Sequence, residues 1–347
     1  MIKVGIIGAG GIAHWHARAF SEFKGSKVMA ACDIDKTRVA AFCERFGIPA
    51  AFDSLDGMLA TAELDAVINA TSDVAHAPTS LAAIAKGLHI LCEKPLATAY
   101  PDAKKMAAAA ARKNVINMVN FSYRNSSAIQ RAHEMVLNGD LGDIVHFDAN
   151  YLQSWLVAES WGKWRESSNW LWRLSTSHGS MGALGDIGVH IIDFATFAAG
   201  AAKSVQCRLK TFDKIKGRNH NGYRLDANDS AVINLELKNG AMGVIHTTRW
   251  ATGYANTLQL RIHGTKGAIR IDLDKSYTSL EICRGKDIDT YSWKEVTCAK
   301  TPSMQQRFLK SVKTGRNDQP DFARGAEIQK ILDACKQSSD NNEIIKL

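Results

Sequence analysis

The chain has 347 residues, 46% of them hydrophobic, so it can bury a substantial core and is long enough for two domains. Its formal net charge of +8 is modest for this length. The densest basic cluster, residues 203–218, lacks the interleaved aromatic residues and the Cys/His spacing of nucleic-acid-binding modules. A solvated edge strand is its better interpretation, and we expect no nucleic-acid partner.

The seven cysteines include no Cys-x-x-Cys pair, which favours free thiols in a reducing compartment and provides no metal-binding set. The sequence starts directly in an apolar strand pattern, without the features of a signal peptide, and it has no run of eighteen apolar residues. These features predict a cytoplasmic protein with no metal and no membrane partner.

The first predicted elements form a nucleotide-binding pattern. A strand over residues 2–7 leads into the loop Gly8-Ala9-Gly10-Gly11-Ile12-Ala13, and a helix follows over residues 12–23. Such a turn places backbone N–H groups and the positive end of a helix against a pyrophosphate. Gly8 permits the tight turn and Gly10 a close approach, so the predicted cofactor contacts are Gly8, Gly10, Gly11 and Ile12.

An acidic residue follows the second predicted strand, residues 28–32, at the distance expected for a ribose-binding carboxylate. This residue, Asp33, would accept hydrogen bonds from the adenosine ribose and repel a 2′-phosphate, so the sequence favours NAD over NADP. Lys36 and Arg38 lie just beyond and could partly neutralise a phosphate, so NADP stays an alternative. A solvated first helical turn explains these two residues at least as well.

Strand and helix patterns alternate up to residue 120, which predicts a doubly wound parallel sheet, a Rossmann domain of residues 1–120. The remaining elements are helices at residues 37–46, 78–86 and 102–113 and strands at residues 66–70, 89–92 and 115–120. Because cofactors bind at the carboxyl ends of such strands, the glycine loop, Thr71-Ser72 and Glu93-Lys94 are expected at one edge of the sheet.

The triplet Glu93-Lys94-Pro95 closes the strand at residues 89–92. By itself such a triplet is usually a surface turn. At the carboxyl end of a cofactor-binding sheet, however, the ammonium group of Lys94 could hydrogen-bond a substrate hydroxyl and carry part of its proton chemistry.

Beyond residue 120 the pattern changes to period two, at residues 143–153, 204–212, 230–238, 241–250, 257–264 and 268–273. The turns Asn239-Gly240 and Thr265-Lys266-Gly267 indicate antiparallel hairpins. We therefore predict a substrate-binding and oligomerisation domain of α+β class over residues 121–320, built on an open, mostly antiparallel sheet. A C-terminal helix lies within residues 321–347, and its return to the first domain is one arrangement.

The open sheet leaves one face to cover. Its strands carry apolar residues that could supply a subunit contact: Val232, Leu235, Val244 and Ile262. A sheet covered by its own helices would also satisfy this pattern.

A second chemical pattern lies in residues 179–190, ahead of an apolar helix over residues 191–198. Asp186 and His190 are four residues apart, so they share one face if the helix begins by about Asp186. A carboxylate there could stabilise an imidazole that exchanges a proton near neutrality. Taken alone, an Asp and a His at a helix start are more often a cap and a core residue. Asp193 is expected to face solvent or partners in its own helix.

Taken together, these motifs resemble the glucose-fructose oxidoreductase, inositol dehydrogenase and rhizopine-catabolism (Gfo/Idh/MocA) family, over the whole chain. The motifs that carry the resemblance are the Gly-x-Gly-x-x-Ala loop, Ala70-Thr71-Ser72-Asp73 with His76, Glu93-Lys94-Pro95, residues 182–190 and Thr314-Gly315-Arg316. The resemblance implies a nicotinamide-dependent dehydrogenase that acts on a secondary alcohol or ketone of a sugar, polyol or derivative. It implies that Lys94, Asp186 and His190 are catalytic and bind the substrate, and that Thr71, Ser72, His76, Glu93 and Lys94 line the cofactor. A homodimer or homotetramer is expected, as in the relatives.

Substrate identity is less well marked in the sequence. Tyr123 and Arg124 match a position that lines the pocket in the family. A tryptophan-rich segment, residues 155–173, could form a carbohydrate platform or equally a packed loop or subunit contact. Within it, Trp172 and Arg173 are the better substrate candidates because they are nearest to the Asp186 motif.

The chemistry of a secondary alcohol requires a base on the oxygen side while hydride leaves the carbon. We assign that role to His190, with Asp186 stabilising its charged form and Lys94 hydrogen-bonding the hydroxyl, although Lys94 is an open alternative as the base. Two other functions stay open: an NAD-dependent glycosidase that uses transient oxidation, and a non-catalytic sugar-sensing regulator.

Overall fold

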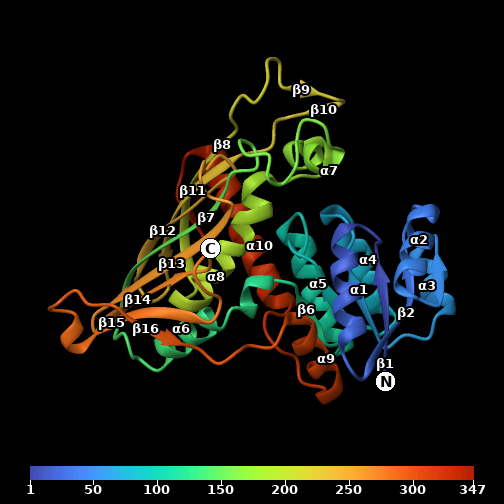
Figure 1. Cartoon of the computed structure of the whole chain (residues 1–347), viewed down its shortest axis with the longest axis horizontal. Coiled ribbons are helices and arrows are strands. Elements are labelled where there is room, and N and C mark those ends of the chain that lie inside the picture. Colours follow the sequence, from blue (N-terminus) through green and yellow to red (C-terminus); the bar gives the residue numbers. More distant parts are fainter. The chain divides into compact units, whose positions relative to one another are not determined.

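The computed structural model describes residues 1–347, apart from the side chain of Asn169. The chain divides into two compact units (Figure 1), each of which is described by itself. Unit 1 comprises Met1–Ser122 and Pro302–Gln329, and unit 2 comprises Tyr123–Thr301 and Lys330–Leu347.

Unit 1 is built on a six-stranded parallel sheet of order β3-β2-β1-β4-β5-β6. Its strands are β1 Ile2–Ile7, β2 Ser26–Cys32, β3 Ala50–Phe52, β4 Ala66–Asn69, β5 His89–Cys92 and β6 Asn117–Val119. Its helices are α1 Gly11–Glu22, α2 Lys36–Phe46, α3 Leu55–Thr61, α4 Asp73–Ala85, α5 Tyr100–Lys113, α9 Met304–Thr314 and the first part of α10 Phe322–Asn341. The strand order reverses between β1 and β4, which is where such sheets bind nucleotides. The predicted doubly wound sheet is confirmed.

Helix α4 starts earlier than predicted. The sequence pattern placed Pro78 at the helix start, where proline is favoured, but the structure has Ser72 at the N-cap position and Pro78 inside the helix. Asp73 in the first turn suits the positive end of the helix. Helix α9 has no counterpart among the predicted elements, and its buried Phe308 completes the core formed with Phe20 and Phe42.

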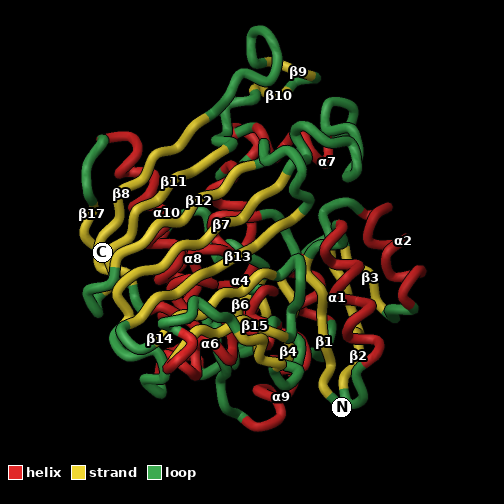
Figure 2. Tube along the Cα trace, turned by 60° about the vertical axis from the view of Figure 1, so that its left-hand side comes forward, coloured by secondary structure: helices red, strands yellow, loops and turns green.

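Unit 2 contains a nine-stranded sheet of order β16-β15-β14-β13-β7-β12-β11-β8-β17 (Figure 2). The strands are β7 Ile144–Gln153, β8 Ala202–Lys210, β11 Ser230–Leu237, β12 Met242–Thr248, β13 Asn256–Gly264, β14 Gly267–Asp272, β15 Ser279–Arg284, β16 Lys294–Thr297 and β17 Ile345–Lys346. A separate pair is formed by β9 Asn219–His220 and β10 Tyr223–Arg224. All pairs in the large sheet are antiparallel except β7 with β12.

The hairpins predicted at Asn239-Gly240 and at Thr265–Gly267 are confirmed by the antiparallel pairing of Glu236 with Met242 and of Gly264 with Gly267. Strand β8 is not an edge strand along its whole length, because β17 pairs with its residues Ser204 and Val205. The two residues of β17 that pair with β8 are far away in the sequence. The basic residues around β8 therefore gave no sign of this pairing.

Helices α6 Ser127–Leu137 and α8 Val189–Ala199 pack against the sheet of unit 2. The four residues predicted to form an apolar open face do not all lie on the same face of the sheet. Leu235 and Ile262 are buried, whereas Val232 is 50% exposed and Val244 is half-buried. Val232 and Leu235 are three residues apart, and an odd spacing in a strand puts side chains on opposite faces. The open face is therefore less apolar than predicted, and the oligomeric state stays a prediction.

All seven cysteines are free and buried. Among the described residues, no group of His, Cys, Asp and Glu has the arrangement of a metal site. The described helices include none with the length and apolar character of a transmembrane segment.

Candidate active site

The glycine loop of unit 1 leaves the start of α1 open to an anion. Gly8 has a φ of +90°, and a Cβ there would lie 2.8 Å from the carbonyl oxygen of Ala70. Gly10 is the N-cap residue, and no side chain caps the helix. A Cβ at Gly10 or Gly11 would meet no atom within 4 Å. The first N–H groups of α1, beside the exposed Ile12, can therefore face a pyrophosphate without steric obstruction.

The Asp33 side chain, 8% exposed, is fixed beside this loop. One carboxylate oxygen accepts the N–H of Ala9 at 2.8 Å, and the other accepts the N–H of Asp35 at 2.9 Å. Arg38 donates to Asp33 at 3.2 Å and also pairs with Asp35. Lys36 pairs instead with Asp53. The two basic residues of this turn are thus engaged by carboxylates, and Asp33 is held where a ribose-binding acid is needed.

Thr71, Ser72 and His76 surround the carboxyl end of β4. The Thr71 hydroxyl donates to Asn69, and Ser72 precedes α4. His76 is buried, with Nδ1 2.7 Å from the carbonyl oxygen of Pro95 and Nε2 3.2 Å from that of Thr71. Burial opposes the charged imidazole, but Cys92, Asp73 and the Pro95 carbonyl outweigh it and raise the pKa of His76 to about 9. His76 therefore ties the loop after β4 to the loop after β5.

Glu93 and Lys94 follow β5. Glu93 is buried, and its Oε1 accepts hydrogen bonds from Asn120 at 2.6 Å and from His16 at 2.9 Å. The N–H of Lys94 donates to Oε2 at 3.3 Å. Lys94 itself is half-buried and precedes the cis peptide bond to Pro95. An ionised Glu93 therefore lies directly beside the residue predicted to meet the substrate.

In unit 2, the segment before α8 is shaped by its glycines and by Asn228. Residues Leu184–Gly188 form a single π-helical turn that runs into α8, so Asp186 and His190 lie on one continuous helical segment. A Cβ at Gly182 would lie 2.4 Å from the amide nitrogen of Asn228, and one at Gly185 would lie 2.2 Å from the Met181 Cβ. Asn228 also accepts the N–H of Leu184 at 2.9 Å. Only glycine allows this close packing.

Two arginines contact the Asp186 carboxylate. Arg249 donates from Nη2 to Oδ2 at 3.0 Å, and Nε of Arg173 is 3.9 Å from the same oxygen. The Asp186 side chain is 27% exposed. Arg173 also lies over the ring of Trp172, with 4.6 Å between guanidinium carbon and ring centroid. The predicted residues Trp172, Arg173 and Asp186 are therefore brought together within unit 2.

His190 is buried next to two tyrosines. The ring of Tyr123 meets it edge-to-face, with 5.0 Å between centroids, and the Tyr151 ring is 6.3 Å away. Asn256 donates to the Tyr123 hydroxyl at 3.1 Å and accepts from Tyr151 at 2.8 Å, and the two hydroxyls hydrogen-bond each other. Burial, then the charge and hydrogen bond of Tyr123, then Asp186 raise the pKa of Tyr151 well above its ordinary value. The Tyr151 phenol therefore stays neutral, and the two tyrosines fix the surroundings of His190.

Arg124, expected to line the substrate pocket, is engaged elsewhere. It is 2% exposed and makes two hydrogen bonds of 2.7 Å to Asp193, also buried, while its guanidinium carbon lies 3.5 Å from the Phe197 ring centroid. The expectation that Asp193 faces solvent or its own helix is therefore wrong. The two residues form a bidentate buried ion pair, which argues against a contact of Arg124 with the substrate.

The tryptophan-rich segment is partly a core. Trp155 and Trp164 are buried in a small cluster with Leu171, Leu174 and Leu225. Trp161 is 37% exposed, and its ring centroid is 6.1 Å from that of Trp170. The packed-loop interpretation therefore holds for the two buried tryptophans.

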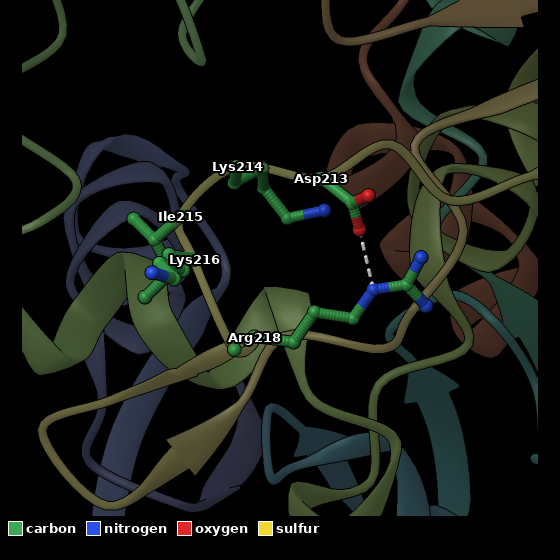
Figure 3. A pocket seen from close by; sticks show the side chains of 6 residues that line it. Asp213, Lys214, Ile215, Lys216 and Arg218 are labelled. Carbon is green, nitrogen blue, oxygen red and sulfur yellow. Dashed lines mark hydrogen bonds and ion pairs between the residues drawn. The ribbon is translucent and has the colours of Figure 1, made fainter.

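A cavity of about 600 Å³ lies in the loop after β8 and is lined by residues 213–218 (Figure 3). An ion pair joins Asp213 to Arg218 across it. None of the predicted site residues lines this cavity. The cavity is therefore separate from the predicted site residues.

Several residues of the two clusters were not predicted: His16, Asn120 and Gln305 around Glu93, and Tyr151, Asn228, Arg249 and Asn256 around Asp186 and His190. They come from segments distant in the sequence. Asn120 alone had a local signal, since it follows a strand of the parallel sheet.

The glycine loop with Asp33, on a parallel sheet of this order, defines a dinucleotide-binding protein. Residues 2–121 match the oxidoreductase family with an NAD-binding Rossmann fold, and residues 129–270 match the GFO/IDH/MocA C-terminal domain. The chain belongs to the Gfo/Idh/MocA family of oxidoreductases.

Known relatives resemble the chain over most of its length. Glucose-6-phosphate 3-dehydrogenase of Bacillus subtilis is 30% identical over 72% of this chain and 68% of its own length. Levoglucosan dehydrogenase of Pseudarthrobacter phenanthrenivorans is 27% identical over 97% of this chain and 96% of its own. A solved structure of levoglucosan dehydrogenase with NADH and levoglucosan has a TM-score of 0.87 at 26% identity, covering 100% of this chain and 99% of that one.

Proposed function

We propose that the protein is an NAD-dependent dehydrogenase that oxidises a secondary hydroxyl of a sugar or a sugar derivative. The observation that carries the proposal is the Asp186–His190 segment, in which a carboxylate held by Arg249 and a buried imidazole occupy one continuous helical segment. An imidazole with a carboxylate partner is a common kind of base for proton removal from an alcohol.

The names of the relatives support a sugar ring as the substrate. One acts as a glucose-6-phosphate 3-dehydrogenase, and another, of Escherichia coli, is a D-glucoside 3-dehydrogenase, 30% identical over 62% of this chain. We therefore take C3 of a pyranose ring as the reacting carbon. The product would be a 3-keto sugar.

The residues present fit NAD. The uncapped start of α1 can receive the pyrophosphate, and the Asp33 carboxylate can accept the ribose hydroxyls. When bound there, NAD would supply the hydride acceptor for the substrate carbon. We propose Thr71, Ser72 and Glu93 as further cofactor contacts, and His76 as a residue that positions their loops.

The catalytic roles follow from the groups available. We propose that His190 accepts the hydroxyl proton and that Asp186 stabilises the resulting imidazolium. Lys94 would donate a hydrogen bond to the same oxygen as negative charge develops. Tyr123, Trp172 and Arg173 would contact the sugar, because aromatic faces and a guanidinium suit ring carbons and hydroxyls. A homodimer or homotetramer completes the proposal.

The test is a panel of hexoses, glycosides, inositols and their keto forms with NAD and NADP in parallel, followed by the absorbance of the reduced nicotinamide. We expect NAD-linked turnover of a glucose-type ring and a 3-keto product identified by NMR. The variants Lys94→Ala, Asp186→Ala and His190→Ala should each lose at least about 100-fold in kcat. Wild-type turnover in any of them would remove that residue from the scheme.

Two outcomes would overturn the proposal itself. Release of a glycoside's aglycone without accumulation of NADH would indicate a glycosidase that uses transient oxidation. Binding of NAD without turnover of any compound in the panel would indicate a sugar-sensing regulator.

A further inference from the structure

The largest fully buried side chain of the described residues is a cation, Arg249, which follows β12 in unit 2. A buried guanidinium keeps its charge, because arginine does not lose its proton in proteins, and it must be met by carboxylates or carbonyl groups. Burial lowers the pKa of Arg249, while the charges of Asp186 and Asp229 oppose that effect. Removing this charge from water costs desolvation free energy, and hydrogen bonds to well-placed partners must offset that cost.

The partners of Arg249 all lie in unit 2. Nη2 donates to Oδ2 of Asp186 at 3.0 Å, and Nη1 donates to the carbonyl oxygen of Arg173 at 3.0 Å. The ring of Trp155 lies 5.0 Å from the guanidinium carbon. Arg249 therefore holds both the Asp186 carboxylate and the backbone of Arg173, whose own guanidinium lies near the same carboxylate.

Asp229, the other acid near Arg249, is hydrogen-bonded to different partners. Oδ2 of Asp229 accepts a hydrogen bond from Lys214 at 2.6 Å and another from the N–H of Phe212 at 2.8 Å, and Lys214 and Asp229 have fully buried side chains. The charges alternate through Lys214, Asp229, Arg249 and Asp186. Of these four side chains only Asp186 is exposed, by 27%. If Asp186 turned away, Arg249 would lose the carboxylate that it hydrogen-bonds, so the carboxylate is held in place.

This arrangement accounts for part of the tryptophan-rich segment. Trp155 packs on the guanidinium and donates through Nε1 to Gln153 at 3.1 Å, and Gln153 donates to Asn256 at 2.8 Å. Asn256 in turn orders the tyrosines beside His190. The surroundings of Asp186 and of His190 are thus joined by one set of contacts within unit 2.

We infer that Arg249 is a positioning residue for the reaction: by holding Oδ2 of Asp186 it fixes the carboxylate that stabilises the charged His190. The inference rests on the proposed function. It differs from a purely structural role in predicting an effect on proton chemistry, because removing a cation next to an acid favours the protonated acid. The charged and titratable groups that face Asp186 include Arg249 after β12, Arg173, and Tyr151 of β7, and His190 lies further along the same helical segment.

The experiment compares Arg249→Met and Arg249→Lys with wild type in pH profiles of kcat, corrected for the folded fraction measured by circular dichroism. For Arg249→Met we expect a kcat lower by about 10- to 100-fold and a substrate KM changed by less than about threefold. The acidic limb should move up by about one pH unit or more. Arg249→Lys keeps the charge and should keep the limb near that of wild type, and it covers the case in which Arg249→Met does not fold.

Lys214→Met is the matched control, since it also breaks a buried ion pair of this unit without touching Asp186. It should lower stability but leave the acidic limb in place. The inference is overturned if the Arg249→Met profile superimposes on that of wild type, or if Lys214→Met moves the limb equally. Loss of turnover in Asp186→Asn but not in the Arg249 variants would overturn the inference alone. Absence of turnover in the wild-type protein would overturn the proposed function, and the inference with it.

Discussion

Nε2 of His16 lies 2.9 Å from Oε1 of Glu93, and both side chains are buried in unit 1. Asn120 donates to the same oxygen, and Gln305 donates to the other nitrogen of the His16 ring at 3.3 Å. Burial would raise the pKa of Glu93, but the hydrogen bond and charge of His16, the hydrogen bond of Asn120 and the charge of Lys94 outweigh it and lower the pKa to about 2. A carboxylate next to Lys94 therefore stays ionised throughout the neutral range.

The first prediction concerns acid stability. A carboxyl whose pKa is lowered on folding stabilises the protein fully above its unfolded pKa, and the contribution is lost as the pH falls through the folded value. For Glu93 this window runs from about pH 4.5 down to about pH 2. Urea unfolding at several pH values should show Glu93→Gln less stable than wild type near neutrality, with the difference shrinking across this window.

Glu236→Gln is the control for that measurement. Glu236 pairs with Lys203 at the surface, where ion pairs contribute little, so its substitution should have a small effect at every pH. A difference between Glu93→Gln and wild type that stays constant from neutral pH to about pH 3 would contradict the account of Glu93.

The fold of unit 1 could be predicted because its signals are local. The strand, the glycine turn and the acid after β2 each lie within a short stretch, and the alternation of elements requires a parallel sheet. Asp33 could be proposed as the ribose-binding acid because such an acid has a regular distance from the loop. The structure then added what the sequence could not show, that Arg38 already pairs with Asp33.

The surroundings of Asp186 and His190 could not be predicted in the same way. Arg249 and Asn256 act through partners 63 and 105 residues away, and neither carries a local motif. Arg124 shows the opposite limit of local reasoning. It adjoins Tyr123, which borders His190, but successive residues point in different directions, and Arg124 turns to Asp193.

The second prediction concerns the choice of cofactor. Asp33→Asn removes the negative charge that repels a 2′-phosphate and releases Arg38, whose side chain is 51% exposed. The ratio of kcat/KM for NAD to that for NADP should fall by about 10- to 100-fold, because a like-charge repulsion of a few kcal/mol is lost. Asp53→Asn removes the neighbouring exposed pair with Lys36 and should leave the ratio unchanged. An unchanged ratio in Asp33→Asn would remove Asp33 from the ribose site.

The third prediction concerns the three hydrogen-bonded side chains beside His190, which are Tyr123, Tyr151 and Asn256. Tyr123→Phe leaves Asn256 and Tyr151 each without one partner in a buried setting, so the free energy of unfolding should fall by about 1–3 kcal/mol. The value of kcat should fall as well, because the contact that fixes the His190 ring loosens. Tyr277→Phe is the control: this ring stacks on Tyr123 but is 46% exposed. Equal effects of the two substitutions on stability and on kcat would contradict the role given to the Tyr123 hydroxyl.

The fourth prediction separates Arg124 from the chemistry. Breaking a buried ion pair on one side leaves an uncompensated charge, so Arg124→Met should lower the free energy of unfolding by about 3–5 kcal/mol. The double variant Arg124→Met with Asp193→Leu removes both charges and should recover most of that loss. Arg261→Met, which breaks the half-exposed pair with Asp148, should cost no more than about 1 kcal/mol. Denaturant unfolding measures all three, and substrate KM in the double variant should match that of wild type. A large rise in KM with stability restored would instead return Arg124 to the substrate site.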